Sequence, residues 1–336
     1  MADALTPSAP SAGLGRATSI VVLNYNTREL LLACIASVRR HALEAELIVV
    51  DNASPDGSAA AVRERYPDVR LIACNENGGF ARGINAGLRA ASRPYVFALN
   101  ADTTLVADTL PELVRALERF PRAGVAGPVQ HLPHPDDRDR CGAQLASVFA
   151  DLTLAHEIRR LVFQGDRIAY RFRRGPWRIE HGGEPREVDW LMGAALFFRR
   201  ECLTAVVGFD ESEFMYGEDW DLCYRARQMG WQVLLVPDAH IVHHENASGK
   251  THFGWRRKAR VMGATLHFHE RHFGRSSRRL FAGVNLVAAS CRLIALLPVA
   301  AFPSRDGQWR NRVRAEFAVA RTALNALGAG TLKQSD

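Results

Sequence analysis

Three acidic side chains stand close together in the second half of the chain. Glu218, Asp219 and Asp221 occur in FMYGEDWDLCYR (residues 214–225), after a glycine and before an apolar pattern with helical spacing. A carboxylate held beside a substrate hydroxyl can act as a general base and take its proton. Acids in the first turn of a helix also interact favourably with the helix dipole, by about 0.3–1 kcal/mol each. The stretch alone leaves both interpretations open, so the elements that position it must be considered.

From residue 18 onward, short apolar segments alternate with amphipathic ones. The expected strands cover residues 19–24, 46–51, 71–74 and 95–100, and the expected helices cover residues 27–41, 57–66, 80–92 and 108–120. Strands that are apolar throughout and joined by helices are typical of a parallel sheet covered on both faces. We therefore predict an α/β fold with a mostly parallel, Rossmann-like sheet flanked by helices. Such sheets bind ligands beyond the carboxyl ends of their strands.

Polar residues follow each of these four strands. In chain order they are Asn24 and Asn26, then Asp51, then Asn77 with Gly78 and Gly79, and finally Asn100 and Asp102. Each group alone is also a good turn sequence. Four such groups at one edge of a sheet indicate a ligand-binding rim.

The residue types at this rim suit a nucleotide and a cation. The carboxylate of Asp51 only accepts hydrogen bonds, as the N3–H group of uracil or thymine requires. Gly78 and Gly79 allow the main chain to approach a phosphate closely, and Arg82 in the next helix is either a phosphate partner or a solvated surface arginine. Asp102 can hold Mg²⁺ or Mn²⁺ against a diphosphate, or it can simply cap a turn.

The composition is that of a globular protein, with 336 residues of which 47% are hydrophobic and 24% charged. The six cysteines include no C-x-x-C pair, which favours reduced thiols over a disulfide frame or a zinc site. Residues 1–17 are rich in Ala, Ser, Pro and Gly and lack the apolar core of a signal peptide, so we predict a disordered tail. These features together predict a cytoplasmic protein.

Residues 251–336 form a basic and apolar C-terminal region. Residues 255–280 are rich in Arg and Lys, and residues 281–302 are apolar but interrupted by Asn285, Arg292 and Pro298. A basic segment that leads into an imperfect apolar helix favours a peripheral position on the inner face of the cell membrane through residues 255–302. A helical hairpin packed on the protein's own body is the alternative. We expect no nucleic-acid partner, because the positive charge comes without a nucleic-acid-binding motif.

Seven segments, taken in order, resemble the inverting family-two glycosyltransferases with a GT-A fold, and within them the bacterial rhamnosyltransferase-like group. They are SIVVLNYN, ELIVVDNAS, NENGGFARGIN, LNAD, WLMGAALFFRRE, GFDESEFMYGEDWDLCYRARQMGW and HIVHHENAS, between residues 19 and 248. The resemblance implies a GT-A domain over residues 18–250 and a nucleotide-sugar donor, with dTDP-rhamnose favoured and UDP-sugars as alternatives. It also implies Mg²⁺ or Mn²⁺, inversion at the anomeric carbon, and a cell-surface or lipid-linked glycan as acceptor.

The same resemblance implies individual roles. It places Asp51 at the base, Asp102 on the metal and Asp219 as the catalytic base, while Gly193 and Ala194 of WLMGAALFFRRE join the donor site. A histidine after the last strand completes the metal or diphosphate site, and the spacing to Ser248 favours His243 over His244. Asn100 stands where many relatives have an acid, so metal binding rests on Asp102 with less charge.

The remaining acids of the opening stretch then receive separate interpretations. We expect Glu218 to shape the acceptor pocket and Asp221 to accept N–H groups in the first turn of its helix, while Trp220 covers the sugar or packs in the core. Residues 130–187 read as an irregular insertion on the acceptor side, with one helix near residues 150–164. A non-catalytic nucleotide-sugar or glycan binding module stays open as an alternative. A nucleotidyltransferase is disfavoured, because no glycine-rich basic loop follows the first strand.

Overall fold

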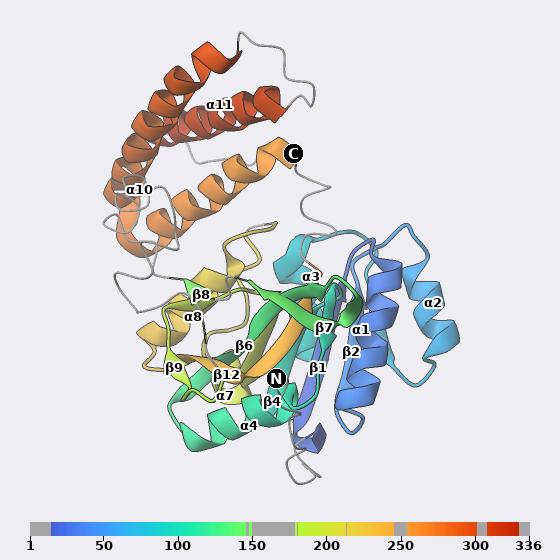
Figure 1. Ribbon diagram of the computed structural model, residues 1–336. Coiled ribbons are helices and arrows are strands. Elements are labelled where there is room, and N and C mark those ends of the chain that lie inside the picture. The colour runs from blue at the N-terminus through green and yellow to red at the C-terminus, as the bar shows by residue number, and fades with distance from the viewer. Residues whose placement is uncertain are drawn as a thin grey trace.

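The computed structural model describes residues 15–145, 148–149, 179, 181–212, 214–244, 254–300 and 308–328, and the structural statements below concern these residues. They form an α/β body with long helices on one side of it (Figure 1). Residues 15–17, at the end of the predicted tail, form the short 3₁₀ helix η1 (Gly15–Ala17). Residues 1–14 and the predicted helix near 150–164 lie outside the described residues.

The first half of the chain alternates between strands and helices at the predicted places and adds the short strand β5, which was not predicted. Its elements are β1 (Thr18–Asn24), α1 (Arg28–His41), β2 (Glu46–Asp51), α2 (Ser58–Arg65), β3 (Arg70–Ala73), α3 (Gly79–Ala90), β4 (Tyr95–Asn100), β5 (Thr103–Leu105) and α4 (Thr109–Arg119).

The second half adds further strands and the helix that carries the acidic stretch. Its elements are β6 (Ala123–His134), β7 (Asp137–Gln144), β8 (Val148–Phe149), β9 (Arg186–Glu187), β10 (Trp190–Leu191), β11 (Ala195–Arg199), α7 (Arg200–Ala205), α8 (Glu218–Gln228), β12 (Gln232–His243), η2 (Gly254–Arg256), α10 (Arg257–Ala300) and α11 (Gln308–Leu327).

The central sheet has the strand order β3-β2-β1-β4-β11-β6-β12-β5. The strands from β3 to β4 are parallel, as predicted, and β6 is parallel to β12. The strand β11 runs antiparallel between β4 and β6, and β5 and β9 are antiparallel to β12. The α/β fold class is therefore confirmed, but the sheet is mixed rather than mostly parallel. An apolar strand sequence does not encode the direction of its neighbours, so the sequence pattern missed this.

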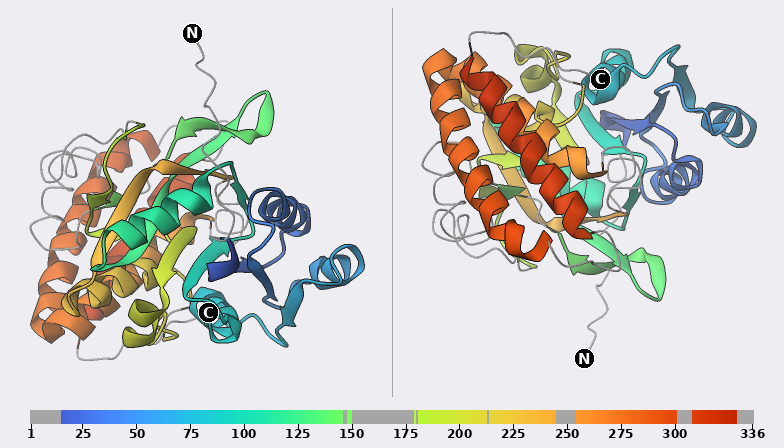
Figure 2. Two further views of the ribbon diagram at one scale, coloured as in Figure 1. Left: turned by 90° about the horizontal axis from the view of Figure 1, so that it is seen from below. Right: turned by 90° about the horizontal axis from the view of Figure 1, so that it is seen from above.

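Two apolar layers cover the two faces of the sheet, and the views in Figure 2 show helices on both sides. Along β1, Ile20 and Val22 face the layer that holds α1 and α4, while Val21 and Leu23 face the layer that holds α3 and α8. All four side chains are buried because alternate residues of a strand point to opposite faces. Both faces of the sheet are therefore buried, and the parallel register of β2 and β4 with β1 places the carboxyl ends of these strands at one edge.

The segment that begins at residue 130 differs from its predicted irregular conformation. The strand β6 continues to His134, and β7 pairs with it antiparallel after a turn at Pro135 and Asp136. The Pro and Asp residues that suggested an irregular flap therefore mark the turn of a hairpin, since both are typical turn residues. Gln130 and His131 consequently lie in the sheet.

The C-terminal region is helical, as predicted. Gly274 interrupts α10 with a φ of 81° and a ψ of 174°, which reverses the chain direction, and α11 packs against both parts. Figure 2 shows α10 in orange and α11 in red side by side. Their shared apolar cluster includes Met262, Leu266, Phe281 and Ala323. The C-terminal region is thus a small helical unit with its own core.

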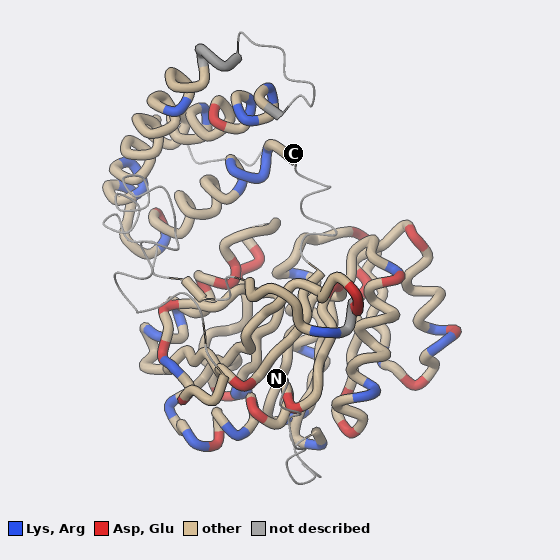
Figure 3. The backbone as a smooth tube through the Cα atoms, viewed as in Figure 1, with Lys and Arg blue, Asp and Glu red and all other residues tan. Residues whose placement is uncertain are grey.

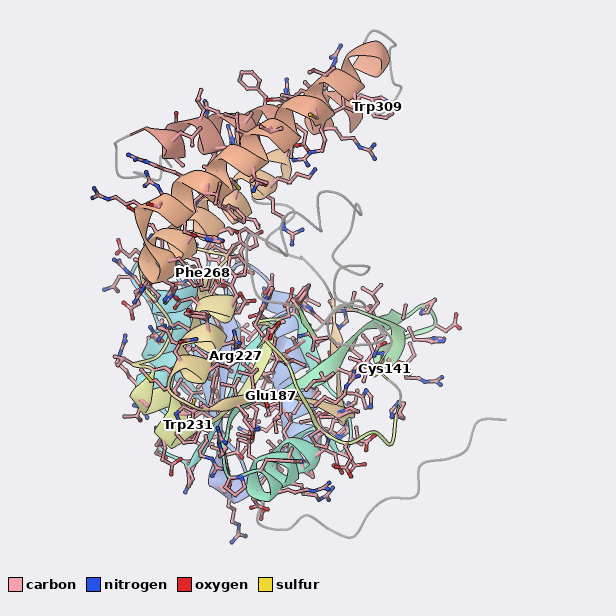
Figure 4. The ribbon with its side chains drawn as sticks, turned by 90° about the vertical axis from the view of Figure 1, so that its left-hand side faces the viewer. Cys141, Glu187, Arg227, Trp231, Phe268 and Trp309 are labelled. Carbon is pink, nitrogen blue, oxygen red and sulfur yellow. The ribbon has the colours of Figure 1, made fainter. Side chains whose placement is uncertain are left out.

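This helical unit is joined to the body beside the acidic stretch. His272 Nε2 lies 2.7 Å from Asp221 Oδ1, and Arg271 forms an ion pair with Asp210. Phe268 packs edge-on against Tyr224 of α8, at a centroid distance of 5.2 Å. Figure 4 labels Phe268 where the C-terminal helices meet α8. The joint therefore combines apolar packing with polar contacts to two aspartates of the body.

Candidate active site

Main-chain hydrogen bonds draw the polar strand ends together. Asn52 N–H donates to Asn24 O at 2.9 Å, and Ala101 N–H donates to Leu23 O at 3.0 Å. The ends of β2 and β4 thus flank the end of β1, since both strands pair with it in parallel. The predicted rim is assembled at one edge of the sheet.

Asp51 is fixed at this rim by neighbours on both sides of its carboxylate. The side chain is 2% exposed; Oδ1 accepts Asn24 Nδ2–H at 2.8 Å and Oδ2 accepts the N–H of Ser54 at 3.0 Å. Ser54 Oγ in turn accepts from Asn24 Nδ2 and from the N–H of Asn26, at 3.0 and 2.9 Å. Each carboxylate oxygen keeps a further lone pair for a ligand. Ser54 stands in the DNAS motif, but its hydroxyl was not singled out from the sequence.

Asn52 organises the loop of Asn77, Gly78 and Gly79. Its Nδ2 donates to Asn77 Oδ1 at 2.8 Å and to Gly79 O at 3.0 Å, and its Oδ1 accepts Gly78 N–H at 3.3 Å. The sequence pattern did not identify this role, because an Asn after a strand looks like any turn residue. Arg82 is exposed on the first turn of α3, with its stem against Gly78.

Gly79 connects this loop to the opening stretch. Its φ of +85° is in the left-handed region, and a Cβ there would lie 2.3 Å from the carbonyl oxygen of Phe214. The same carbonyl accepts the N–H of Phe80 at 2.9 Å. A glycine is required at this position by both the backbone angle and the close approach.

Asp102 and His243 face each other in a buried position. His243 Nε2 lies 3.4 Å from Asp102 Oδ1, and both side chains are about one-tenth exposed or less. His243 Nδ1 lies 3.1 Å from Gln130 Oε1, and an amide oxygen only accepts, so Nδ1 carries the proton. Nε2 is the ring nitrogen that faces Asp102, and its lone pair can coordinate an ion when this nitrogen is unprotonated. Gln130, whose Nε2 donates to Met192 O at 3.5 Å, was hidden from sequence analysis inside the predicted irregular segment.

The side chain of His244 points toward Thr104 instead of Asp102. Its Nε2 lies 3.3 Å from Thr104 Oγ1, and its main-chain N–H donates to Asp102 O at 2.9 Å. The structure brings His243, and not the imidazole of His244, against the carboxylate of Asp102.

The donor set of Asp102 and His243 fits a divalent cation. A carboxylate oxygen and an unprotonated imidazole nitrogen at this separation can bind the same ion. Two protein ligands leave the other coordination positions of the ion to phosphate oxygens and water. Mg²⁺ prefers oxygen ligands alone, whereas Mn²⁺ also accepts imidazole. The residues present therefore match Mn²⁺ better than Mg²⁺.

Asp219 lies in the first turn of α8 and is held by two N–H groups. Oδ2 accepts Gly193 N–H at 2.9 Å, and Oδ1 accepts the N–H of Trp220 at 2.9 Å. Burial raises the pKa of Asp219 to about 6, although these hydrogen bonds oppose the rise. Ala194 O accepts Asn100 N–H at 3.0 Å, so Gly193 and Ala194 join Asp219 to the end of β4. These two residues therefore connect the acidic stretch to the rim.

Glu218 and Trp220, the residues on either side of Asp219, point into different environments. Glu218 is buried and lines a small pocket between α8 and α10; the other lining residues are Asp210, Gly217, Asp221, Ala264, His267 and Phe268. Trp220 is buried and packs edge-on against Trp190 at 5.5 Å, so of its two predicted roles the structure favours the core.

The prediction for Asp221 is wrong. Its carboxylate binds Arg225 Nε at 2.7 Å and His272 Nε2 at 2.7 Å, rather than N–H groups of its own helical turn. The arginine four residues along the helix forms an ion pair with this buried acid, and the imidazole from α10 lies within hydrogen-bond distance of its other oxygen.

Comparisons with known proteins agree with this geometry. The family model Glycosyl transferase family 2 matches residues 19–160, and the model Glycosyl transferase family group 2 matches residues 95–327. The N-acetylglucosaminyl-diphospho-decaprenol L-rhamnosyltransferase of Mycobacterium tuberculosis is 31% identical over 217 residues. That alignment covers 59% of this chain and 66% of the relative, slightly less than two thirds of its length.

Two solved structures share the fold. The mannosyltransferase PcManGT from Pyrobaculum calidifontis, in complex with GDP-Man and Mn²⁺, has a TM-score of 0.56 at 20% identity, covering 93% of this chain and 87% of that one. GalNAc-T7 with UDP, GalNAc and Mn²⁺ has a TM-score of 0.52 at 15% identity, covering 75% and 47%. Because one family model alone spans residues 95–327, more than half of the sequence, the chain belongs to the family-2 glycosyltransferases.

Proposed function

We propose that this protein is an inverting glycosyltransferase that moves a sugar from a nucleotide-diphosphate donor to an acceptor hydroxyl, with Asp219 as the general base. The observation that carries this proposal is the position of Asp219, which Gly193 and Ala194 connect to the same sheet edge as Asp51 and Asp102. A base and a nucleotide site that share one edge suit a single displacement.

The donor would lie across the carboxyl ends of β1, β2 and β4. Asp51 would accept the N3–H of the pyrimidine, and the 77–79 loop would lie beside the ribose, with the N–H groups of Gly78 and Gly79 held by the side chains of Asn52 and Asn77. Asn24 and Asn26 support Asp51 through Ser54. Asp102 and His243 would hold Mn²⁺ or Mg²⁺, which supplies positive charge beside the diphosphate when bound.

In the reaction, the acceptor hydroxyl gives its proton to Asp219 as its oxygen attacks the anomeric carbon. The new carbon–oxygen bond forms on the face opposite the diphosphate, whose bond to the same carbon breaks with both electrons. One displacement of this kind inverts the anomeric configuration. Asp219 suits the proton transfer because a pKa of about 6 leaves it ionised at pH 7 yet basic enough to act.

The favoured donor is dTDP-rhamnose, and the favoured acceptor is a lipid-linked glycan. The M. tuberculosis relative is named as an L-rhamnosyltransferase that acts on N-acetylglucosaminyl-diphospho-decaprenol, which supports the sugar and the lipid-linked acceptor. The carboxylate of Asp51 suits the N3–H donor of thymine. UDP-galactofuranose and UDP-N-acetylhexosamines are the alternative donors, because Asp51 accepts the N3–H of uracil equally well. The surroundings of Glu218, which is adjacent in the chain to the proposed base, are the proposed acceptor side.

The proposed site of action is the cytoplasmic face of the cell membrane. Among the described residues, one helix, Gly254–Leu296, is long and apolar enough by length and composition to cross a membrane, and 22% of its most apolar window is buried. Leu280, Val287 and Ile294 recur every seven residues and are each more than half exposed. Lys and Arg are spread along the same helices (Figure 3). An exposed apolar stripe with nearby basic residues supports peripheral attachment rather than spanning.

A donor screen tests the function. The purified protein with Mn²⁺ and a polyprenyl-diphosphate-linked N-acetylglucosamine acceptor is offered dTDP-rhamnose, UDP-galactofuranose or UDP-N-acetylglucosamine, and products are read by mass spectrometry. We expect a mass increase of one deoxyhexose with dTDP-rhamnose. Transfer from a UDP-sugar alone would refute the donor assignment. Saturable donor binding without transfer or hydrolysis of any donor would favour the non-catalytic binding module.

A further inference from the structure

Three histidines and an aspartate form a second cluster of metal-ligating groups, away from the site described above. His131 lies on β6, Asp238 and His240 lie on β12, and His181 precedes β9. His131 Nε2 is 3.0 Å from His240 Nδ1, and His240 Nε2 is 3.0 Å from His181 Nδ1. Candidate ligand atoms of His181, Asp238 and His240 all lie within 4.8 Å of one another. The cluster thus has the compactness that a shared ion requires.

The hydrogen-bond direction along this row of imidazoles follows from one main-chain carbonyl. His131 Nδ1 lies 3.3 Å from Gly142 O of β7, which only accepts, so Nδ1 carries the proton and Nε2 becomes an acceptor. His240 Nδ1 must then carry the proton that it donates to His131. His240 Nε2 is left with a lone pair that faces His181. Metal-binding histidines are characteristically oriented in this way, by an acceptor at the other ring nitrogen.

Asp238 supplies an oxygen at the same place. Its Oδ1 lies 3.8 Å from His181 Nδ1 and accepts the N–H of Gly182 at 2.7 Å, which fixes the carboxylate beside the imidazole. The side chains of His181 and Asp238 are 66% and 42% exposed. An ion can therefore reach the three ligand atoms from solvent and keep water in its remaining coordination positions.

This cluster is separated from the donor site by the sheet itself. Gln130, which orients His243, and His131, which orients His240, are adjacent in β6. Neighbouring residues of a strand point to opposite faces, so the two groups lie on opposite sides of the β6–β12 pair. An ion at one group would not share ligands with an ion at the other.

We propose that His240 Nε2, His181 Nδ1 and Asp238 Oδ1 bind one Zn²⁺ ion, with His131 as the positioning residue for His240. Two imidazoles and one carboxylate are a common zinc ligand set, and water completes the tetrahedron. The ion fastens residues 181–182 to β12. This site is independent of the proposed glycosyl transfer, because none of its ligands belongs to the donor or acceptor residues named above.

Zinc titration of the metal-free full-length chain tests the proposal. Isothermal calorimetry counts the bound Zn²⁺ ions, and Co²⁺ serves as a visible probe of tetrahedral coordination. The test variant is His181→Ala with Asp238→Asn, two exposed or half-exposed positions where substitution spares the core. The matched control is His134→Ala with Asp136→Asn, another His–Asp pair, in the β6–β7 hairpin.

We expect the test variant to bind one Zn²⁺ fewer than the wild type, or to bind that ion at least tenfold more weakly, and to lose the tetrahedral Co²⁺ absorption. The control should match the wild type in both measurements. Circular dichroism verifies that both variants are folded, and the Asp102–His243 site is unchanged in all three proteins. Equal zinc stoichiometry and affinity in the wild type and the test variant would overturn the proposal.

Discussion

The carboxylate of Asp219 is held by Gly193 N–H on one oxygen and by Trp220 N–H on the other. Both bonds favour the ionised form, but burial outweighs them and leaves the pKa at about 6. A base with this pKa is ionised at neutral pH and is a stronger proton acceptor than a solvated aspartate. The orientation of the carboxylate is set by these two main-chain N–H groups.

Replacement of Asp219 is the first test of its proposed role as base, at the residue scale. We expect Asp219→Asn to lower turnover by about 10²–10⁴-fold, which is the usual contribution of a general base. Donor binding, measured by calorimetry with dTDP and Mn²⁺, should stay close to the wild-type value. Asp136→Asn, at an exposed hairpin turn, is the control. Wild-type turnover in Asp219→Asn would remove Asp219 from the role of base.

The pH dependence gives a second test of the same residue. Only the ionised carboxylate accepts a proton, and its pKa is raised, so activity is lost as pH falls through about 6 rather than through about 4. We expect kcat/KM to rise about tenfold per pH unit below this value and to level off above it. Initial rates at subsaturating acceptor between pH 5 and 8 measure this. A flat profile across that range would contradict the assignment.

The two adjacent histidines allow a paired test of the cation site. His243→Gln removes the imidazole that faces Asp102, whereas His244→Gln changes the side chain that faces Thr104. We expect His243→Gln to raise the Mn²⁺ concentration for half-maximal activity by at least tenfold, and His244→Gln to leave it nearly unchanged. Equal effects of the two substitutions would argue against His243 as a ligand.

At the scale of elements, the loop between β3 and α3 couples the donor rim to the acidic stretch. Gly79 needs a positive φ and touches the carbonyl of Phe214, whereas Gly57 has a similar φ of +78° with open space around it. Substitution of Gly57 by alanine therefore tests the effect of backbone strain alone, whereas substitution of Gly79 tests strain together with a steric clash.

We expect Gly79→Ala to lower the free energy of unfolding by about 3 kcal/mol or more, because the left-handed strain of about 1–3 kcal/mol is joined by a clash with main chain. Gly57→Ala should cost only the strain, about 1 kcal/mol. Urea denaturation followed by circular dichroism measures both. Similar losses for the two variants would mean that the loop moves away from Phe214 without cost.

The order of elements could be predicted from the sequence because each strand and helix of the first half carries a local apolar pattern. The direction of β11 and the continuation of β6 to His134 could not, since both depend on pairing with strands distant in the chain. The prediction for Asp221 failed for the same reason: its partner His272 lies in a helix whose docking no local pattern reveals.

At the scale of the whole molecule, the C-terminal helices dock beside the acidic stretch and carry an exposed apolar surface of their own. They line the pocket beside Glu218 and supply the His272 and Arg271 contacts to the body. The helices pack on a core of their own and contact the body, as the alternative of a packed helical hairpin predicts, and they leave Leu280, Val287 and Ile294 exposed. Membrane attachment stays a prediction.

Membrane attachment is tested with this stripe. We expect the triple variant Leu280→Gln, Val287→Gln and Ile294→Gln to bind vesicles of phosphatidylglycerol and phosphatidylcholine at least tenfold more weakly in flotation assays. Full burial of one such side chain contributes about 1.5–3 kcal/mol, so partial insertion of three suffices for this loss. The control replaces Leu43, Val207 and Met229, which are equally exposed on the body, with Gln. Equal flotation of both triple variants would contradict attachment through α10.

The sequence by itself determined the alternation of strands and helices and the polar rim, because these features are written in short local patterns. The roles proposed for Asp51, Asp102 and Asp219 come from the resemblance to family-two glycosyltransferases. Only the tertiary structure decided that His243 rather than His244 faces Asp102, that Gly193 holds Asp219, and that Asp221 pairs with α10. It also brought His131, His181 and His240 together from separate segments. Contacts of this kind depend on strand order, register and helix docking, which arise from the packing of the whole chain and not from any one segment.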